Sequence, residues 1–194
     1  MDYKTKTDLM LPFKGIWTVT NGGRDASINS HIRPPDQGPQ SQLYAYDFRN
    51  GHIGNGEKLE DYEVFGKEVI APGDGEIIQV INGAIDNKPG ERDRNVGIGN
   101  AIIIDHKNGE YSLLGHFKHD SISVKVGDVV KAGDVIGLCG NTGNTSEPHV
   151  HFGLQDGPRL SNEKSLYAQF RKIIVDGEIR ENYEPIKGQK ASNI

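Results

Sequence analysis

Residues 101–116 read AIIIDHKNGEYSLLGH, and this stretch decides the fold. Two short runs rich in apolar residues, Ala101–His106 and Glu110–His116, flank the turn residues Lys107-Asn108-Gly109. Asn-Gly is a dipeptide that readily accepts the positive φ angles of a tight hairpin turn. The stretch therefore predicts two antiparallel strands joined by a short turn.

Other short runs on either side of this hairpin also favour strands. Glu76–Val80, Val124–Val126 and Val129–Lys131 are rich in β-branched residues and lie between glycine-containing turns. The best helix candidate, Ser161–Phe170, runs directly into Ile173-Ile174-Val175, whose β-branched side chains favour a strand or a loop. The sequence thus predicts an all-β, mainly antiparallel fold: a sheet or sandwich of short strands with tight glycine-rich turns.

Two long segments between the predicted strands lack regular patterning: Gly22–Gln42 and Asn82–Asn100. Structureless loops longer than about 12–15 residues are usually functional or disordered. We expect them to wall a groove, although a plain surface loop is an equal alternative for the second. The polar segment Lys187–Ile194 is expected to fray. Residues Met1–Lys6 lead into no apolar stretch typical of a signal peptide, so a cytoplasmic protein and a trimmed exported form both stay open.

Composition excludes several classes of protein. The chain has 194 residues, 35% of them hydrophobic, which is enough for one domain with a sizeable core. Its 22 basic and 27 acidic residues give a net charge of −5, and no basic block suits a nucleic-acid partner. No apolar run approaches the roughly 20 residues that span a bilayer. The single cysteine, Cys139, excludes a disulfide scaffold and is predicted to be a small buried residue.

The histidines are the first candidates for chemistry. His149-Val150-His151 reads as part of a strand, in which alternate side chains point to opposite faces. Val150 can then enter the core while the two imidazoles share the other face. A pair of solvated surface histidines would give the same pattern. His116, however, also ends an apolar strand beside a glycine, and this repetition favours a functional cluster.

A carboxylate is the second candidate. Asp47 lies within the alternating aromatic segment Tyr44–Phe48, where an unpartnered Asp is costly to bury. A metal cation is one possible partner, and a hydrogen bond at a strand end is the other. A catalytic zinc ion has three protein ligands, commonly His nitrogen and Asp oxygen, and one open position. The residues suited to such a site are Asp47, one of His149 and His151, and a further histidine.

Several motifs follow one another in a distinctive order: Gly115-His116-Phe117, the Val- and Gly-rich segment 124–137, Gly140-Asn141-Thr142-Gly143 and Pro148-His149-Val150-His151-Phe152. This order closely resembles the lysostaphin-type (LytM-like) zinc endopeptidases. The resemblance also takes in Val69–Gly75 and the 101–116 hairpin. It spans about residues 44–155, and residues 1–30 and 156–194 are covered poorly. We therefore expect a single domain over 1–194 with its core at 44–155, an N-terminal segment and groove loop at 1–43, and a C-terminal extension at 156–194.

The resemblance implies that Asp47 and His151 are zinc ligands. The family's remaining ligand is a histidine four residues before the Asp, where this chain has Leu43. A similar branch of the family carries Asn-Gly-Gly, a nearby Asn-x-His and then Gln-x-Tyr-Ala-x-Asp, and this chain has all three patterns between residues 21 and 47. His31, from the Asn-x-His pattern, is the expected substitute. His52 is a second candidate, and an incomplete site with a solvated His31 is the alternative.

By the same resemblance, His116 and His149 are the histidines that bind no metal and handle protons. Glu147 is a weaker candidate for a base, because its position in a turn favours a solvated side chain. His106 and His119 flank turns and are expected at the surface.

The implied function is a zinc-dependent endopeptidase, with one Zn2+ per chain, acting on peptide bonds of bacterial cell-wall peptidoglycan. That substrate implies the cell envelope or the exterior. A non-catalytic domain that binds a partner or regulates cell-wall hydrolases is the main alternative, suggested by Leu43. A carrier or phosphotransfer module is a lesser one, because it would have no use for Asp47 beside His151. The oligomeric state stays open.

Overall fold

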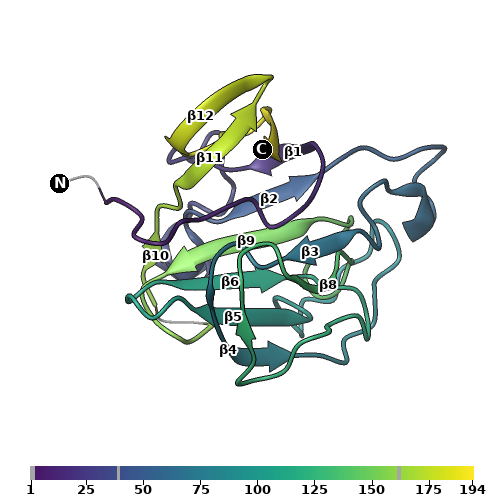
Figure 1. The fold of residues 1–194 in the computed structure, drawn as a ribbon. Helices are drawn as coiled ribbons and strands as arrows, with labels where there is room; N and C mark the ends of the chain where they lie inside the picture. Colours follow the sequence, from purple (N-terminus) through teal and green to yellow (C-terminus); the bar gives the residue numbers. More distant parts are fainter. Residues whose placement is uncertain (1–2, 39, 161–162) are drawn as a thin grey trace.

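The computed structural model describes residues 3–38, 40–160 and 163–194. One large sheet has the strand order β12-β11-β13-β1-β2-β9-β6-β5-β4-β7, with β10 paired to β9, and β3 and β8 form a small second sheet. Figure 1 shows the run from β12 and β11 through β1, β2, β9, β6 and β5 to β4. The strands are β1 (Trp17–Asn21), β2 (Tyr46–Arg49), β3 (Glu68–Ile70), β4 (Gly75–Ile81), β5 (Ala101–Asp105), β6 (Tyr111–Gly115), β7 (Val129–Val130), β8 (Val135–Leu138), β9 (Val150–Gln155), β10 (Ser165–Leu166), β11 (Phe170–Val175), β12 (Glu178–Tyr183) and β13 (Lys190–Asn193). Three short 3₁₀ turns are η1 (Pro35–Gln37), η2 (Gln40–Gln42) and η3 (Leu59–Asp61). The paired strands are antiparallel, so the predicted fold class is confirmed.

The hairpin predicted from residues 101–116 is β5 and β6, paired with Ile102 opposite Leu114. Lys107 and Gly109 take positive φ angles of 60° and 84° in its turn. Ile102, Ile104 and Leu114 pack in the main core, whereas Ile103 packs in a second, smaller cluster. The hairpin is therefore apolar on both faces, which explains its unbroken run of isoleucines.

Two expectations about local structure are wrong. Residues 187–194 do not fray, because β13 pairs with β1 and β11 and buries Ala191 completely. Val124–Val126 is not a strand. The Lys125 backbone N–H donates to the Asp128 carboxylate at 2.9 Å, and this local bond forms a turn in place of a strand ladder.

The described part of the helix candidate 161–170 is strand and loop, not helix. Residues 161 and 162 lie outside the described residues, β10 takes Ser165–Leu166, residues 167–169 are irregular, and β11 begins at Phe170. Strands β11 and β12 form a hairpin at one end of the sheet (Figure 1), joined by Asp176-Gly177 with φ angles of 51° and 87°. With β1 and β13, this hairpin extends the sheet well beyond the 44–155 core.

Both long loops contribute to the surroundings of one groove. The loop of residues 22–42 is irregular apart from η1 and η2. The loop of residues 82–100 is tied to the 141–145 loop by Asn87, whose amide donates to the carbonyls of Asn141, Gly143 and Thr145. Side chains from each loop line the groove.

Two further predictions concern Cys139 and membrane-spanning segments. Cys139 is 1% exposed, as predicted, and burial raises the pKa of its thiol, which keeps it protonated and unreactive. In the described part of the chain, no helix is long and apolar enough to cross a bilayer.

Candidate active site

The central strand β9 carries the site on one face and the core on the other. Val150 and Phe152 are fully buried in the main core. His151, between them, therefore points to the opposite face. It pairs with Asp47 of β2 on one side and with Gly115 of β6 on the other. Because directly paired residues share a face of a sheet, the register places His151 beside Asp47.

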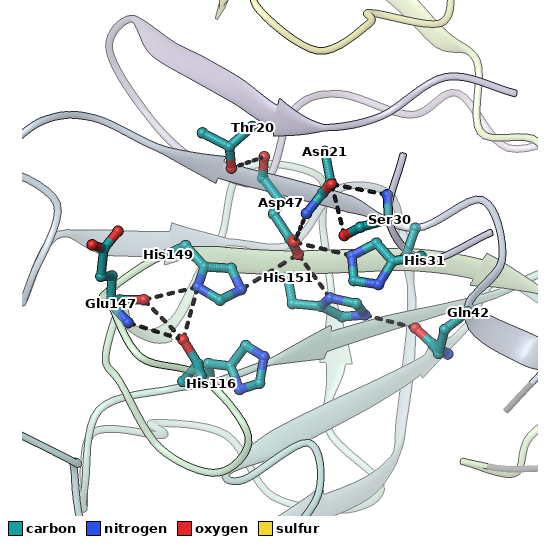
Figure 2. Close-up of polar contacts among 12 residues, drawn as sticks. Thr20, Asn21, Ser30, His31, Gln42, Asp47, His116, Glu147, His149 and His151 are labelled. Carbon is teal, nitrogen blue, oxygen red and sulfur yellow. Dashed lines mark hydrogen bonds and ion pairs between the residues drawn. The ribbon is translucent and has the colours of Figure 1, made fainter. Parts of the chain in front are cut away.

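The Asp47 carboxylate is the centre of the cluster (Figure 2). Its Oδ1 lies 2.9 Å from His151 Nδ1 and 3.3 Å from His149 Nε2, and its Oδ2 lies 3.0 Å from His31 Nε2. Asn21 Nδ2 also donates to Oδ2 at 2.6 Å. Burial raises the pKa of this carboxyl, but the nearby imidazoles outweigh burial and hold the pKa well below its usual range. Asp47 is therefore an anion at neutral pH.

His31 reaches Asp47 because two asparagines fix its loop. The buried Asn29 donates its amide to the carbonyls of Gly23 and Ala45, and its Oδ1 accepts the His31 backbone N–H at 3.1 Å. The Asn21 Oδ1 accepts both the backbone N–H and the hydroxyl of Ser30. The roles of the two asparagines were not predicted from the sequence. Their only signal was the Asn-Gly-Gly and Asn-x-His patterns of the resemblance.

The predicted metal ligands lie together. Donor atoms of His31, Asp47 and His151 lie within 4.8 Å of one another. Two imidazole nitrogens and a carboxylate oxygen are a donor set that zinc accepts. An anionic carboxylate facing several ring nitrogens also needs protons or a cation between them. The residues present therefore fit a zinc ion. His52 lies elsewhere, exposed and bridged to Tyr62.

The two predicted proton handlers lie beside this trio. The ring centroids of His116 and His149 are 4.7 Å apart. His116 Nδ1 lies 2.7 Å from the Thr142 carbonyl, and His149 Nδ1 lies 2.9 Å from the Glu147 carbonyl. Because a carbonyl only accepts, each Nδ1 carries a proton and each Nε2 of a neutral ring has a free lone pair. Burial, with the neighbouring His149 and His151, holds the pKa of His116 well below its ordinary value.

Gly143 allows the approach that positions the Thr142 carbonyl. It has a φ of 84°, and a Cβ there would lie 2.4 Å from the Gly99 backbone nitrogen. The Thr142 hydroxyl in turn donates to the Phe117 carbonyl at 2.8 Å. Close packing of two loops thus fixes the backbone atom that His116 contacts. Sequence reasoning missed this role for Thr142.

The remaining candidates lie outside the chemistry. His106 is not a surface residue as expected: it is 9% exposed, and its ring contacts the Asp74 carbonyl and the Ser112 hydroxyl, both at 2.7 Å. Packing between two strands, which its place beside a turn did not indicate, explains the difference. His119 is exposed, as predicted. The half-exposed Glu147 carboxylate pairs with Arg49 and not with a site histidine.

A groove of about 660 Å³ contains the cluster. Cationic side chains from four segments line it: Arg33, Arg49, Arg92 and Lys187. Asp47 and Glu147 are the acidic residues in its lining. The groove is therefore more positive than the chain as a whole, whose net charge is −5.

A known protein family matches the part of the chain that contains three of the five candidate site residues. Residues 56–167, more than half of the 194 residues, match the family described as Peptidase family M23. The matched range contains His116, His149 and His151, whereas His31 and Asp47 precede it.

Curated relatives are similar over shorter segments. An uncharacterized metalloprotease of Buchnera aphidicola subsp. Baizongia pistaciae is 36% identical over 84 residues, 43% of this chain and 21% of that protein. The DD-carboxypeptidase/endopeptidase Mpg of Neisseria meningitidis serogroup B is 41% identical over 59 residues, 30% of this chain and 13% of that protein. Lysostaphin of Staphylococcus staphylolyticus is 41% identical over 58 residues, 30% of this chain and 12% of that protein. The chain thus spans between 12% and 21% of the lengths of these relatives.

Solved structures share the fold. A zinc-containing peptidase from Vibrio cholerae has a TM-score of 0.50 and 25% identity, covering 77% of this chain and 36% of that one. The catalytic domain of the prophage-encoded M23 protein EnpA from Enterococcus faecalis has a TM-score of 0.51 and 20% identity, covering 80% of this chain and 92% of that one. The resemblance to lysostaphin-type enzymes is therefore confirmed by sequence and by fold, and the chain belongs to peptidase family M23.

Proposed function

We propose that this chain is a zinc-dependent endopeptidase that hydrolyses peptide bonds of bacterial peptidoglycan. The observation that carries the proposal is the Asp47 carboxylate, which contacts nitrogen atoms of three histidines at 2.9–3.3 Å on the floor of an open groove. Such a substrate implies action in the cell envelope or outside the cell.

His31, Asp47 and His151 would hold one zinc ion per chain. A bound zinc polarises a peptide carbonyl and lowers the pKa of its water to about 7. The contact between His31 and Asp47 supplies the imidazole that Leu43 lacks, which removes the main reason to favour a non-catalytic domain.

His116 and His149 would move the protons. Each ring has its Nδ1 proton held by a backbone carbonyl, so only Nε2 is available to exchange a proton. One Nε2 accepts the proton of the attacking water, and an Nε2–H gives a proton to the leaving amine. Burial keeps His116 neutral at neutral pH, and a neutral ring is the form that accepts a proton.

The groove favours a peptide that carries carboxylates. Its volume of about 660 Å³ suits a short peptide segment. Its lining has four cationic side chains against two acidic ones, so the local field attracts an anionic substrate although the chain has a net charge of −5. Stem peptides of peptidoglycan carry carboxylates, whereas glycine bridges are neutral.

Metal analysis and digestion of purified peptidoglycan test the function together. We expect one zinc per purified chain and the release of soluble peptide fragments, both lost in the His151→Ala protein and both retained in the His119→Ala control, because His119 is exposed and outside the cluster. Metal-replete protein that releases no fragments would contradict the proposal.

The charge of the groove is tested separately with Lys187→Glu and its control Lys172→Glu, both exposed positions. Only the first lines the groove, so only the first should raise KM for a carboxylate-bearing stem peptide, and the increase should shrink as salt is added. An equal KM for both variants would remove the argument for an anionic substrate.

A further inference from the structure

Gln42 contacts His151 at Nε2, the ring nitrogen that does not face Asp47. Its Nε2 lies 2.7 Å from Gln42 Oε1, and the two side chains are buried, with exposures of 3% and 7%. The carboxamide reaches the ring across Gly153, where a Cβ would lie only 2.9 Å from Gln42 Oε1. Glycine at this position therefore leaves the space that the contact occupies (Figure 2 shows Gln42 beside His151).

The other end of the Gln42 carboxamide faces acceptors. Its Nε2 lies 3.5 Å from both Ser41 Oγ and Gln155 Oε1. The Ser41 hydroxyl donates its own proton to the Leu160 carbonyl at 3.2 Å. Ser41 Oγ therefore has only lone pairs to offer Gln42, and the amino end of the carboxamide must face it.

Gln155 imposes the same orientation. Its Nε2 donates to the carbonyls of Gly157 and Arg159 at 2.7 and 2.6 Å. Because carbonyls only accept, the Gln155 amide cannot turn round, and its Oε1 must face Gln42. A reversed Gln42 would set two amide oxygens against each other. Backbone carbonyls of the segment after β9 thus determine which end of Gln42 meets His151.

The end that meets His151 is an oxygen, which only accepts, so His151 Nε2 carries a proton. A neutral imidazole has one ring proton, and Nδ1 is then left with a lone pair directed at Asp47. We propose that Gln42, oriented by Ser41 and Gln155, is a positioning residue that fixes His151 as the Nε2–H tautomer with Nδ1 free to bind the metal. This inference rests on the proposed function for the identity of the metal.

This tautomer of His151 places two hydrogen-bond acceptors against each other in the metal-free protein. The Nδ1 lone pair and Asp47 Oδ1, 2.9 Å apart, are both acceptors and repel unless a cation lies against them. Metal-binding histidines generally donate their second ring N–H to a carbonyl or carboxylate, and loss of that partner costs about 10- to 100-fold in metal affinity.

The tautomer is measured directly in metal-stripped, full-length protein labelled with ¹⁵N in its histidines, at about pH 8.5, above the ordinary range for an imidazole to protonate. Long-range ¹H–¹⁵N correlation distinguishes the protonated ring nitrogen from the bare one, and the signals absent from the His151→Gln protein identify His151. We expect a proton on Nε2 and none on Nδ1. A spectrum with a proton on Nδ1, alone or with Nε2, would overturn the inference.

Two variants remove the contact in different ways. Gln42→Met keeps the length of the side chain but has no carboxamide, and Gly153→Ala places a methyl group only 2.9 Å from Gln42 Oε1, too close for the oxygen to keep its position. Each should mix or reverse the tautomer and weaken zinc binding, measured by competition with a chelator, by about 10- to 100-fold. Gln37→Met, in the exposed turn η1, is the matched control and should bind zinc as the unmodified protein does.

The two variants also keep the inference testable if one fails to fold. Zinc affinity and tautomer unchanged in a folded variant would refute the role of Gln42. Expected tautomer and zinc results without peptide hydrolysis would refute the proposed reaction and leave this role standing. Hydrolysis by a protein that carries the proton on His151 Nδ1 would refute the role of Gln42 and leave the proposed reaction standing.

Discussion

His31 Nε2 lies 3.0 Å from Asp47 Oδ2, although the two residues are 16 positions apart and His31 belongs to no strand. The loop between them brings an imidazole to a strand carboxylate, and Asn29 fixes the backbone of His31 by accepting its N–H. An irregular segment can thus present a candidate ligand when a buried side chain anchors it.

Replacement of His31 tests its role as a ligand. We expect the His31→Ala protein to lose most of its zinc during dialysis, because only two of three protein donors remain. Metal content by atomic absorption measures this, with His119→Ala as the control. Full zinc occupancy in the His31→Ala protein would exclude His31 as a ligand.

His116→Ala and His149→Ala should each keep the zinc and lose activity. Groups that transfer protons contribute about 10²- to 10⁴-fold to rate. Steady-state rates on a stem peptide and the zinc content of the same samples test both halves of the expectation. Loss of metal from either variant would instead identify that histidine as a ligand.

The pH dependence of kcat/KM follows from the environment of His116. Burial and nearby histidines lower its pKa, so the ring stays neutral, and able to accept a proton, to lower pH than a free imidazole. We expect a bell-shaped profile with a plateau between about pH 6.5 and 8.5 and an acid limb below that range. His116→Gln should displace one limb only. A flat profile between about pH 5 and 9 with zinc bound would contradict proton transfer by histidine.

Glu110 links the N-terminal segment to the hairpin and should contribute to stability. Its buried carboxylate accepts the Tyr3 hydroxyl, the backbone N–H groups of Lys6 and Thr7 at 2.8 Å, and the Thr7 hydroxyl at 2.6 Å. Hydrogen bonds to a charged group contribute about 1.5–3 kcal/mol. Glu110→Gln should lower the free energy of unfolding by about that amount in urea titrations near neutral pH, whereas Glu57→Gln, at an exposed position, should not.

The same residue predicts how stability depends on pH. Burial raises the pKa of Glu110, but its hydrogen bonds outweigh burial and lower the pKa overall. A group with a lower pKa in the folded state stabilises fully above its unfolded pKa of about 4.3 and loses this contribution as the pH falls through the folded value. The difference in stability between the native protein and Glu110→Gln should therefore shrink below about pH 4.3. A difference that stays constant to lower pH would show that the charge of Glu110 is not involved.

Local sequence determined the β5–β6 hairpin and the placement of the central histidines. The Asn-Gly turn and the β-branched runs of 101–116 specify a hairpin through short-range conformational preferences, and the alternation of residues 149–154 sets two imidazoles on one face of a strand. Residues 187–194 are ordered, contrary to expectation, because they pair with β1 and β11, distant strands that no local pattern reveals.

Only the tertiary structure decided how the site is completed. Adjacent strands β2 and β9 bring Asp47 to His151, a folded loop brings in His31, and Gln42 meets His151 across 109 residues of sequence. Which end of a side-chain amide donates depends on the groups around it. The carbonyls of Gly157 and Arg159 orient the Gln155 carboxamide only because packing places them beside it. The sequence names the chemical groups, but the direction in which each donates or accepts depends on neighbours that the fold alone supplies.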